Sequence, residues 1–119
     1  MAGIALTTNT SSLTAIANDY GYEYIFSRQL EGIGKKGDVL VAITTSGNSK
    51  NVLNAVAAAR KLGMSVIGMT GEKGKTFSDL CDVALVTPSD KTPRIQEGHI
   101  AMGHAICELI EHALYGEKL

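Results

Sequence analysis

The centre of the chain reads VLVAITTSGNSKNVL over residues 39–53. A run of apolar, strand-forming residues breaks into hydroxyl residues and Gly47, and apolar residues then return at helical spacing. This order predicts a strand, a tight turn and the start of a helix. Because the strand is apolar at nearly every position, we expect both of its faces to be covered, as in a parallel sheet.

The same alternation continues on both sides of this stretch. Further strands are expected at 3–7, 64–70 and 82–87, and helices at 10–17, 22–33, 48–62, 76–81 and 92–115. Strands that alternate with helices imply a mostly parallel sheet with helices on both faces. The predicted fold is therefore α/β, a doubly wound three-layer αβα sandwich formed by one domain over residues 1–119.

Composition excludes several classes of function. A net charge of −1 over 119 residues offers no basic surface for a nucleic acid. The sequence holds no apolar run long enough to cross a bilayer and no signal peptide, so we expect no membrane partner. Cys81 and Cys107 lie far apart and are interpreted as reduced thiols of a cytoplasmic protein.

The turn after the central strand is the strongest candidate site. Thr44, Thr45, Ser46 and Ser49 place four hydroxyls at a helix N-terminus, where unpaired N–H groups and partial positive charge favour a phosphate. The alternative is that these side chains only cap the helix. Their position at the carboxyl end of a buried strand is where open α/β sheets bind ligands, so we predict a phosphorylated small molecule.

Two other groups of polar residues permit both a functional and a structural interpretation. Asn18 and Asp19 follow the first predicted strand and suit either a turn or contacts with sugar hydroxyls. His104 lies in the predicted terminal helix, where it could serve chemistry or belong to a solvated, ion-paired stripe. His99 and His112 are interpreted as structural.

Three strings carry a resemblance to a known family. TTSGNS at 44–49, NDYGY at 18–22 and RIQEGHI at 94–100 together resemble the sugar isomerase (SIS) domains and, within them, the bacterial phosphoheptose isomerases. The resemblance covers essentially the whole chain. It implies a cytoplasmic aldose–ketose isomerase that converts sedoheptulose 7-phosphate to D-glycero-D-manno-heptose 7-phosphate for lipopolysaccharide heptose, with one zinc ion per active site and a homotetrameric assembly.

The resemblance also implies roles for single residues. It gives the phosphate to Thr44, Thr45, Ser46 and Ser49. It gives contacts with the sugar to Asn18, Asp19 and Gln96. Gln96 and His104 would bind the metal, and His104 would also act as a catalytic acid or base.

The family has a further stretch before the point at which this chain begins. It comprises helices, a strand, a glycine-rich turn and a helix with a His ligand and a Glu base. We therefore expect a truncated sheet that lacks its first strand, an uncovered apolar edge and little activity in this chain alone.

Two questions stay open from the sequence. Gln96 and His104 are eight positions apart, roughly 12 Å along a helix, so either the metal is shared between subunits or Gln96 lies in an irregular first turn. The alternative function is a non-catalytic SIS domain that binds a sugar phosphate or associates with a replication initiator.

Overall fold

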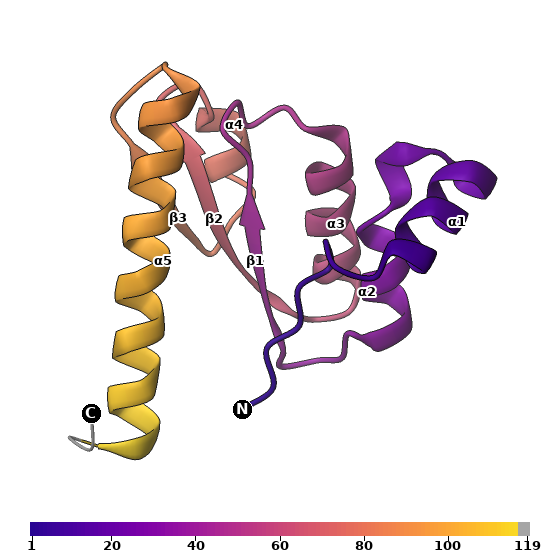
Figure 1. The fold of residues 1–119 in the computed structure, drawn as a ribbon, viewed down its shortest axis with the longest axis horizontal. Coiled ribbons are helices and arrows are strands. Elements are labelled where there is room, and N and C mark those ends of the chain that lie inside the picture. The colour runs from indigo at the N-terminus through magenta and orange to yellow at the C-terminus, as the bar shows by residue number, and fades with distance from the viewer. Residues whose placement is uncertain (117–119) are drawn as a thin grey trace.

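The computed structural model describes residues 1–116 and contains nine helices and strands within that range (Figure 1). In chain order they are α1 (Thr10–Tyr20), the 3₁₀ turn η1 (Tyr22–Tyr24), α2 (Ser27–Ile33), β1 (Val39–Ile43), α3 (Lys50–Lys61), β2 (Ser65–Gly71), α4 (Lys75–Ser78), β3 (Val83–Thr87) and α5 (Thr92–Tyr115). The central strand, turn and helix lie where the sequence predicts them.

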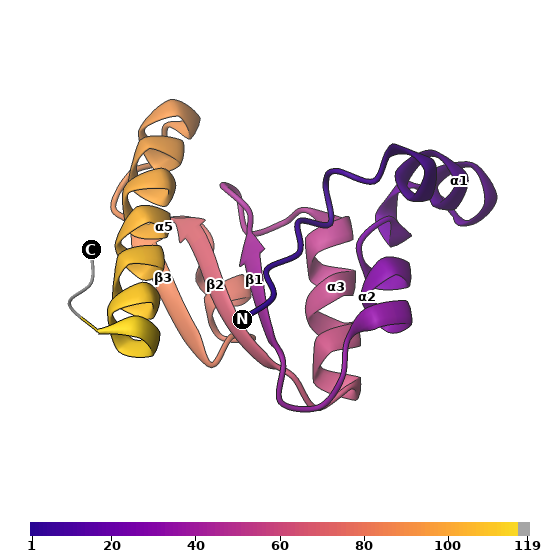
Figure 2. The same ribbon diagram turned by 60° about the horizontal axis from the view of Figure 1, so that its bottom comes forward.

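The three strands form one parallel sheet in the order β1-β2-β3. The register pairs Val41 with Ile67, and Ile67 with Val83. Helices α3 and α4 lie on one side of the sheet and α5 on the other, while α2 packs against the outer side of α3 (Figures 1 and 2). The predicted α/β fold with a parallel sheet between helices is confirmed.

The core lies between the sheet and α3. Val52, Ala55, Val56 and Ala59 recur at helical spacing and are all buried. They pack with the inward side chains of β1 and β2 and with Phe77 of α4 in one cluster. Gly63, with a φ of 73°, lies just beyond this helix, at the left-handed position that the sequence predicts.

The other face of the sheet is only partly covered. Ile95 and His99 are the buried residues of α5, and they lie near its start. On β1, which is an edge strand, Val39, Val41 and Ile43 are 55%, 46% and 52% exposed. The expectation of an uncovered apolar edge is confirmed.

The predicted strand at 3–7 is wrong. Residues 3–5 have no regular structure and are exposed, and residues 6–7 form a turn. A strand exists only with a partner to pair with, and β1, whose edge is free, pairs only with β2 within residues 1–116. The segment is instead held at Leu6, whose carbonyl oxygen accepts a hydrogen bond of 3.0 Å from Gln29 Nε2.

The first two predicted helices also differ from prediction, and the short helix expected at 76–81 is α4 at Lys75–Ser78. The first helix does not break at Asn18 but continues to Tyr20 and ends at Gly21, which has a φ of 105°. The predicted helix at 22–33 is divided into η1 and α2.

Within residues 1–116, no helix combines the length and the hydropathy that spanning a membrane requires.

Candidate functional site

Backbone hydrogen bonds tie together the three loops that follow the strands. Gly71 N, at the end of β2, donates to Thr45 O in the turn after β1 at 3.2 Å. Glu72 N donates to Ser89 O in the loop after β3, also at 3.2 Å. Because the strands are parallel, all three loops lie at the same edge of the sheet.

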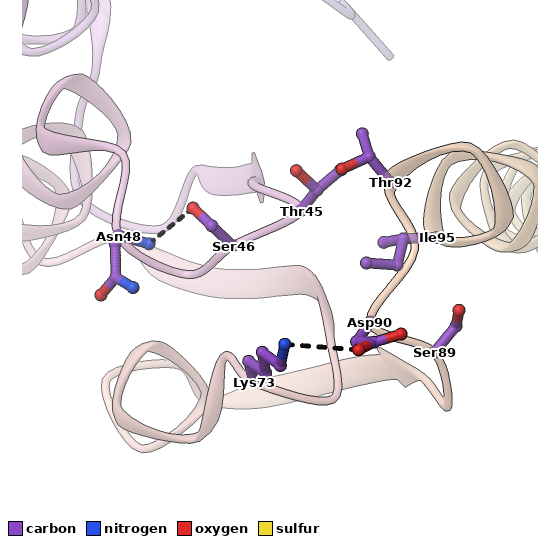
Figure 3. Close-up of a pocket in the computed structure, with 8 residues that line it drawn as sticks. All are labelled: Thr45, Ser46, Asn48, Lys73, Ser89, Asp90, Thr92 and Ile95. Atoms are coloured by element: carbon purple, nitrogen blue, oxygen red, sulfur yellow. Dashed lines mark hydrogen bonds and ion pairs between the residues drawn. The ribbon is translucent and has the colours of Figure 1, made fainter.

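A cavity of about 170 Å³ lies among these loops. The turn after β1 contributes Thr45, Ser46 and Asn48, and the loop after β2 contributes Lys73. The remaining lining comes from the loop after β3 and the start of α5, namely Ser89, Asp90, Thr92 and Ile95. Figure 3 shows Thr45 and Thr92 on one side of the cavity, and Lys73 with Asp90 on the other.

The four predicted phosphate-binding hydroxyls occupy different positions. Thr45 and Ser46 line the cavity. Thr44 is buried, and its Oγ1 lies 2.9 Å from Ser49 Oγ in a hydrogen bond across the turn. Thr44 therefore holds the turn together from the inside, and only two of the four hydroxyl residues border the cavity.

The structure gives little support to the alternative that the hydroxyl side chains of this turn only cap α3. Ser49 is the N-cap residue of α3, but its side chain makes no capping hydrogen bond. Ser46 Oγ accepts a hydrogen bond from Asn48 N at 3.1 Å, before the helix begins (Figure 3). The first turn of α3 thus begins without a side-chain cap from Ser49, beside the lining residues of the cavity.

Gly47 fixes the path of the turn. Its φ is 72°, and a Cβ placed on it would lie 2.6 Å from Gly74 Cα. A glycine is required here for both reasons, because other residues rarely adopt this conformation and no side chain fits. The close approach also joins the turn to the segment that carries Lys73.

Asn18 and Asp19 do not line the cavity. They are exposed at the end of α1, where Asn18 Nδ2 donates to Asp19 Oδ1 at 2.9 Å. The residues that follow, Gly21 and Tyr22, border a second and more open hollow of about 630 Å³, together with Ser49. The structure therefore brings this pair near the turn but leaves both side chains in solvent.

Gln96 and His104 lie on one continuous helix. α5 is helical from Thr92 onward, so the irregular first turn offered as one explanation is wrong. Both side chains are exposed, and eight positions correspond to roughly 12 Å along the axis. Across residues 1–116, no three His, Cys, Asp or Glu side chains are grouped closely enough for a metal ion. Within a single chain, Gln96 and His104 could meet at one zinc ion only if their side chains reached towards each other along the helix.

Sequence reasoning missed several residues of the cavity wall. Lys73, Ser89 and Asp90 lie in loops that look like ordinary turns in the sequence, and Thr92 is the first residue of α5. The signal that could have found them is their position, because each follows the carboxyl end of a parallel strand. His99 is buried, as its structural interpretation predicts, and its Nε2 has no hydrogen-bond partner among the described residues.

The shifted pKa values lie away from the cavity. A hydrogen bond from Val66 N at 2.6 Å, followed by one from Arg60 Nη1 at 2.7 Å, lowers the pKa of Asp82. Burial raises the pKa of the nearby Cys81 thiol. Arg60 also donates to Leu80 O at 2.8 Å, so this cluster fastens α3 to the start of β3.

Comparison with known proteins places this geometry in a family. The family model of the SIS domain matches residues 1–71. The chain is 55% identical to a phosphoheptose isomerase of Sulfurimonas denitrificans over 96% of its own length and 58% of that protein. It is 57% identical to a phosphoheptose isomerase of Rhodospirillum rubrum, over 96% of this chain and 61% of that one.

A solved structure of a phosphoheptose isomerase from Neisseria gonorrhoeae has the same fold. It superposes with a TM-score of 0.89 at 50% identity, over 92% of this chain and 61% of that chain. The chain thus spans about three fifths of the length of these relatives, 58–61% in the three comparisons. Since the family model covers more than half of its residues, the chain belongs to the SIS domain family.

Proposed function

We propose that the whole protein is a phosphoheptose isomerase, which converts sedoheptulose 7-phosphate to a heptose 7-phosphate. The observation that best supports this proposal is the cavity of about 170 Å³ at the carboxyl ends of the strands, in a chain 55–57% identical to two phosphoheptose isomerases. A cytoplasmic location, a homotetrameric assembly and a role in lipopolysaccharide heptose synthesis belong to the same proposal.

Thr45 and Ser46 bind the phosphate in this proposal. Both residues line the cavity beside the start of α3, whose first N–H groups and partial positive charge favour an anion. Thr44 and Ser49 act indirectly, because their mutual hydrogen bond of 2.9 Å holds the turn in shape. The phosphate end of the substrate is thereby fixed, which positions the sugar carbons for reaction.

The isomerisation itself moves a proton between the first two carbons of the sugar. It needs an acid and a base, and donors that stabilise the developing oxyanion. Gln96 and His104 are the candidates on α5, with His104 as acid or base. Because roughly 12 Å of helix separates these two residues, we propose that groups outside this chain complete the site, where Gln96 and His104 would hold a zinc ion that would polarise the sugar carbonyl. Asn18 and Asp19 remain proposed sugar contacts.

Binding of the substrate tests the phosphate assignment. Titration of the ¹⁵N-labelled chain with sedoheptulose 7-phosphate is expected to shift the amide signals of residues 44–49 and of the first turn of α3. Combined Thr45→Ala and Ser46→Ala replacement is expected to weaken binding about tenfold or more, since two donors to a charged group are lost. Ser65→Ala, an exposed hydroxyl at the start of β2, is the matched control. Equal weakening in the control would contradict the assignment.

A turnover assay separates catalysis from binding alone. Since residues 1–116 hold no three-residue group of His, Cys, Asp or Glu at one point, this chain by itself fits a sugar-phosphate-binding role. We expect binding of sedoheptulose 7-phosphate with little or no conversion. Turnover near that of a full-length phosphoheptose isomerase would contradict the expected incompleteness of the site.

A further inference from the structure

Two opposite charges face each other on the wall of the cavity. Lys73 Nζ lies 3.3 Å from Asp90 Oδ2, and the two residues come from the loops after β2 and β3 (Figure 3). Their side chains are 71% and 49% exposed. Exposed pairs of this kind contribute little to stability. The hydrogen bond from Glu72 N to Ser89 O joins the same two loops independently of the pair.

The pair carries all of the formal charge on the cavity wall. Lys73 is the one cation and Asp90 the one carboxylate among the lining residues, and the others are neutral. A phosphate that enters the cavity is attracted by the ammonium group and repelled by the carboxylate. Lys73 has a flexible stem and three N–H donors, so it can turn from the carboxylate to a phosphate oxygen without movement of the backbone.

We propose that Lys73 is the residue that selects a phosphorylated ligand, and that it exchanges Asp90 for the phosphate when the ligand binds. The inference rests on the proposed function for the location of the phosphate but adds a residue on a different loop. Asp90 then competes with the ligand for the same ammonium group. Removing Lys73 must weaken anion binding, while removing the charge of Asp90 must strengthen it.

This opposition in sign distinguishes a selecting residue from a structural one. If the ion pair only held the two loops in place, loss of either partner would loosen the cavity and both variants would bind more weakly. If Lys73 acted only through net charge, any nearby lysine would matter equally. Lys75 provides that comparison, because it lies two positions away, is 87% exposed and does not line the cavity.

The experiment uses inorganic phosphate as the probe and the 119-residue chain as the protein. Lys73→Met is expected to raise the Kd for phosphate about fivefold or more, because a charge-assisted contact is lost. Asp90→Asn is expected to lower it about two- to fivefold, since a like charge is removed. Lys75→Met is expected to leave it unchanged. Added salt should reduce the differences in Kd for phosphate between these variants and the unmodified chain. Unphosphorylated sedoheptulose should bind Lys73→Met and the unmodified chain equally.

Each result bears on the inference. Weaker binding in both Lys73→Met and Asp90→Asn would overturn it, and so would equal weakening in Lys75→Met. If the combined Thr45→Ala and Ser46→Ala variant loses phosphate binding while Lys73→Met retains full affinity, this inference fails and the proposed phosphate site stands. If Lys73→Met weakens phosphate binding but sedoheptulose 7-phosphate does not bind, the proposed substrate fails and the selecting role stands. Failure of the unmodified chain to bind phosphate would contradict both.

Discussion

Replacement of Gly47 by alanine tests whether the turn after β1 is fixed by its contact with Gly74. The substitution carries two separate costs. Alanine must adopt the positive φ of 72°, and its Cβ must fit at 2.6 Å from Gly74 Cα and 3.2 Å from Phe77 Cβ. Since the nearest atom belongs to the backbone, no rotation of a side chain can relieve the contact.

The two costs can be estimated separately. The left-handed conformation costs an L-residue roughly 1–2 kcal/mol. Forcing an extra carbon into packed surroundings costs about 1–3 kcal/mol more. Gly37→Ala isolates the first cost, because its φ is 91° and nothing lies within 4 Å of the added Cβ. Gly47→Ala should therefore lower the free energy of unfolding by about 1–3 kcal/mol more than Gly37→Ala.

Urea unfolding followed by far-ultraviolet circular dichroism measures both variants. The effect of alanine on the unfolded chain is common to the two and cancels in the comparison. Gly63→Ala adds a second control, because its φ is 73° and its near contact at 3.2 Å is the flexible side chain of Lys36. Equal destabilisation of Gly47→Ala and Gly37→Ala would refute the inference that the contact with Gly74 fixes the turn.

Two further predictions concern charge and exposure. Because the pKa of Asp82 is lower in the folded state, its stabilisation is present above the ordinary value of 3.8 and is lost as the pH falls through the folded pKa. Asp82→Asn should thus lower the urea midpoint at neutral pH and make the midpoint less sensitive to pH below 3.8. Val41→Lys should reduce self-association in sedimentation velocity, since charge protects an apolar edge strand. The free energy of unfolding of this variant should stay within about 0.5 kcal/mol of that of the unmodified chain. A larger loss would contradict the exposed placement of Val41.

The sequence predicts the centre of the fold because its signals there are local. The apolar run, the hydroxyl turn and the helical spacing of Val52 and Val56 each act over a few residues. The strand expected at 3–7 fails for the opposite reason, since a strand depends on a neighbour that the segment itself does not encode. The helix break expected at Asn18 also fails, since the helix continues through Asn18 and Asp19 to Tyr20 and ends only at Gly21.

Some residues of the site can likewise be predicted from local sequence, whereas others depend on how the chain folds. Thr45 and Ser46 are predicted from the turn itself and border the cavity. The interior position of Thr44 depends on packing, which the order of residues does not reveal. Lys73 and Asp90 are separated by 17 positions and meet only because two loops fold to the same edge.

Helix α5 outreaches the sheet on which it lies. Its 24 residues extend about 36 Å, whereas strands of 5–7 residues extend about 17–23 Å. The buried anchors Ile95 and His99 both belong to its first turns, and Leu109 and Leu114 are exposed. The first turns of this one helix are therefore expected to be more stable against local opening than its last turns. Amide protons near Ile95 should exchange with deuterium only when the whole domain opens, while those of the last turns should exchange through local fraying.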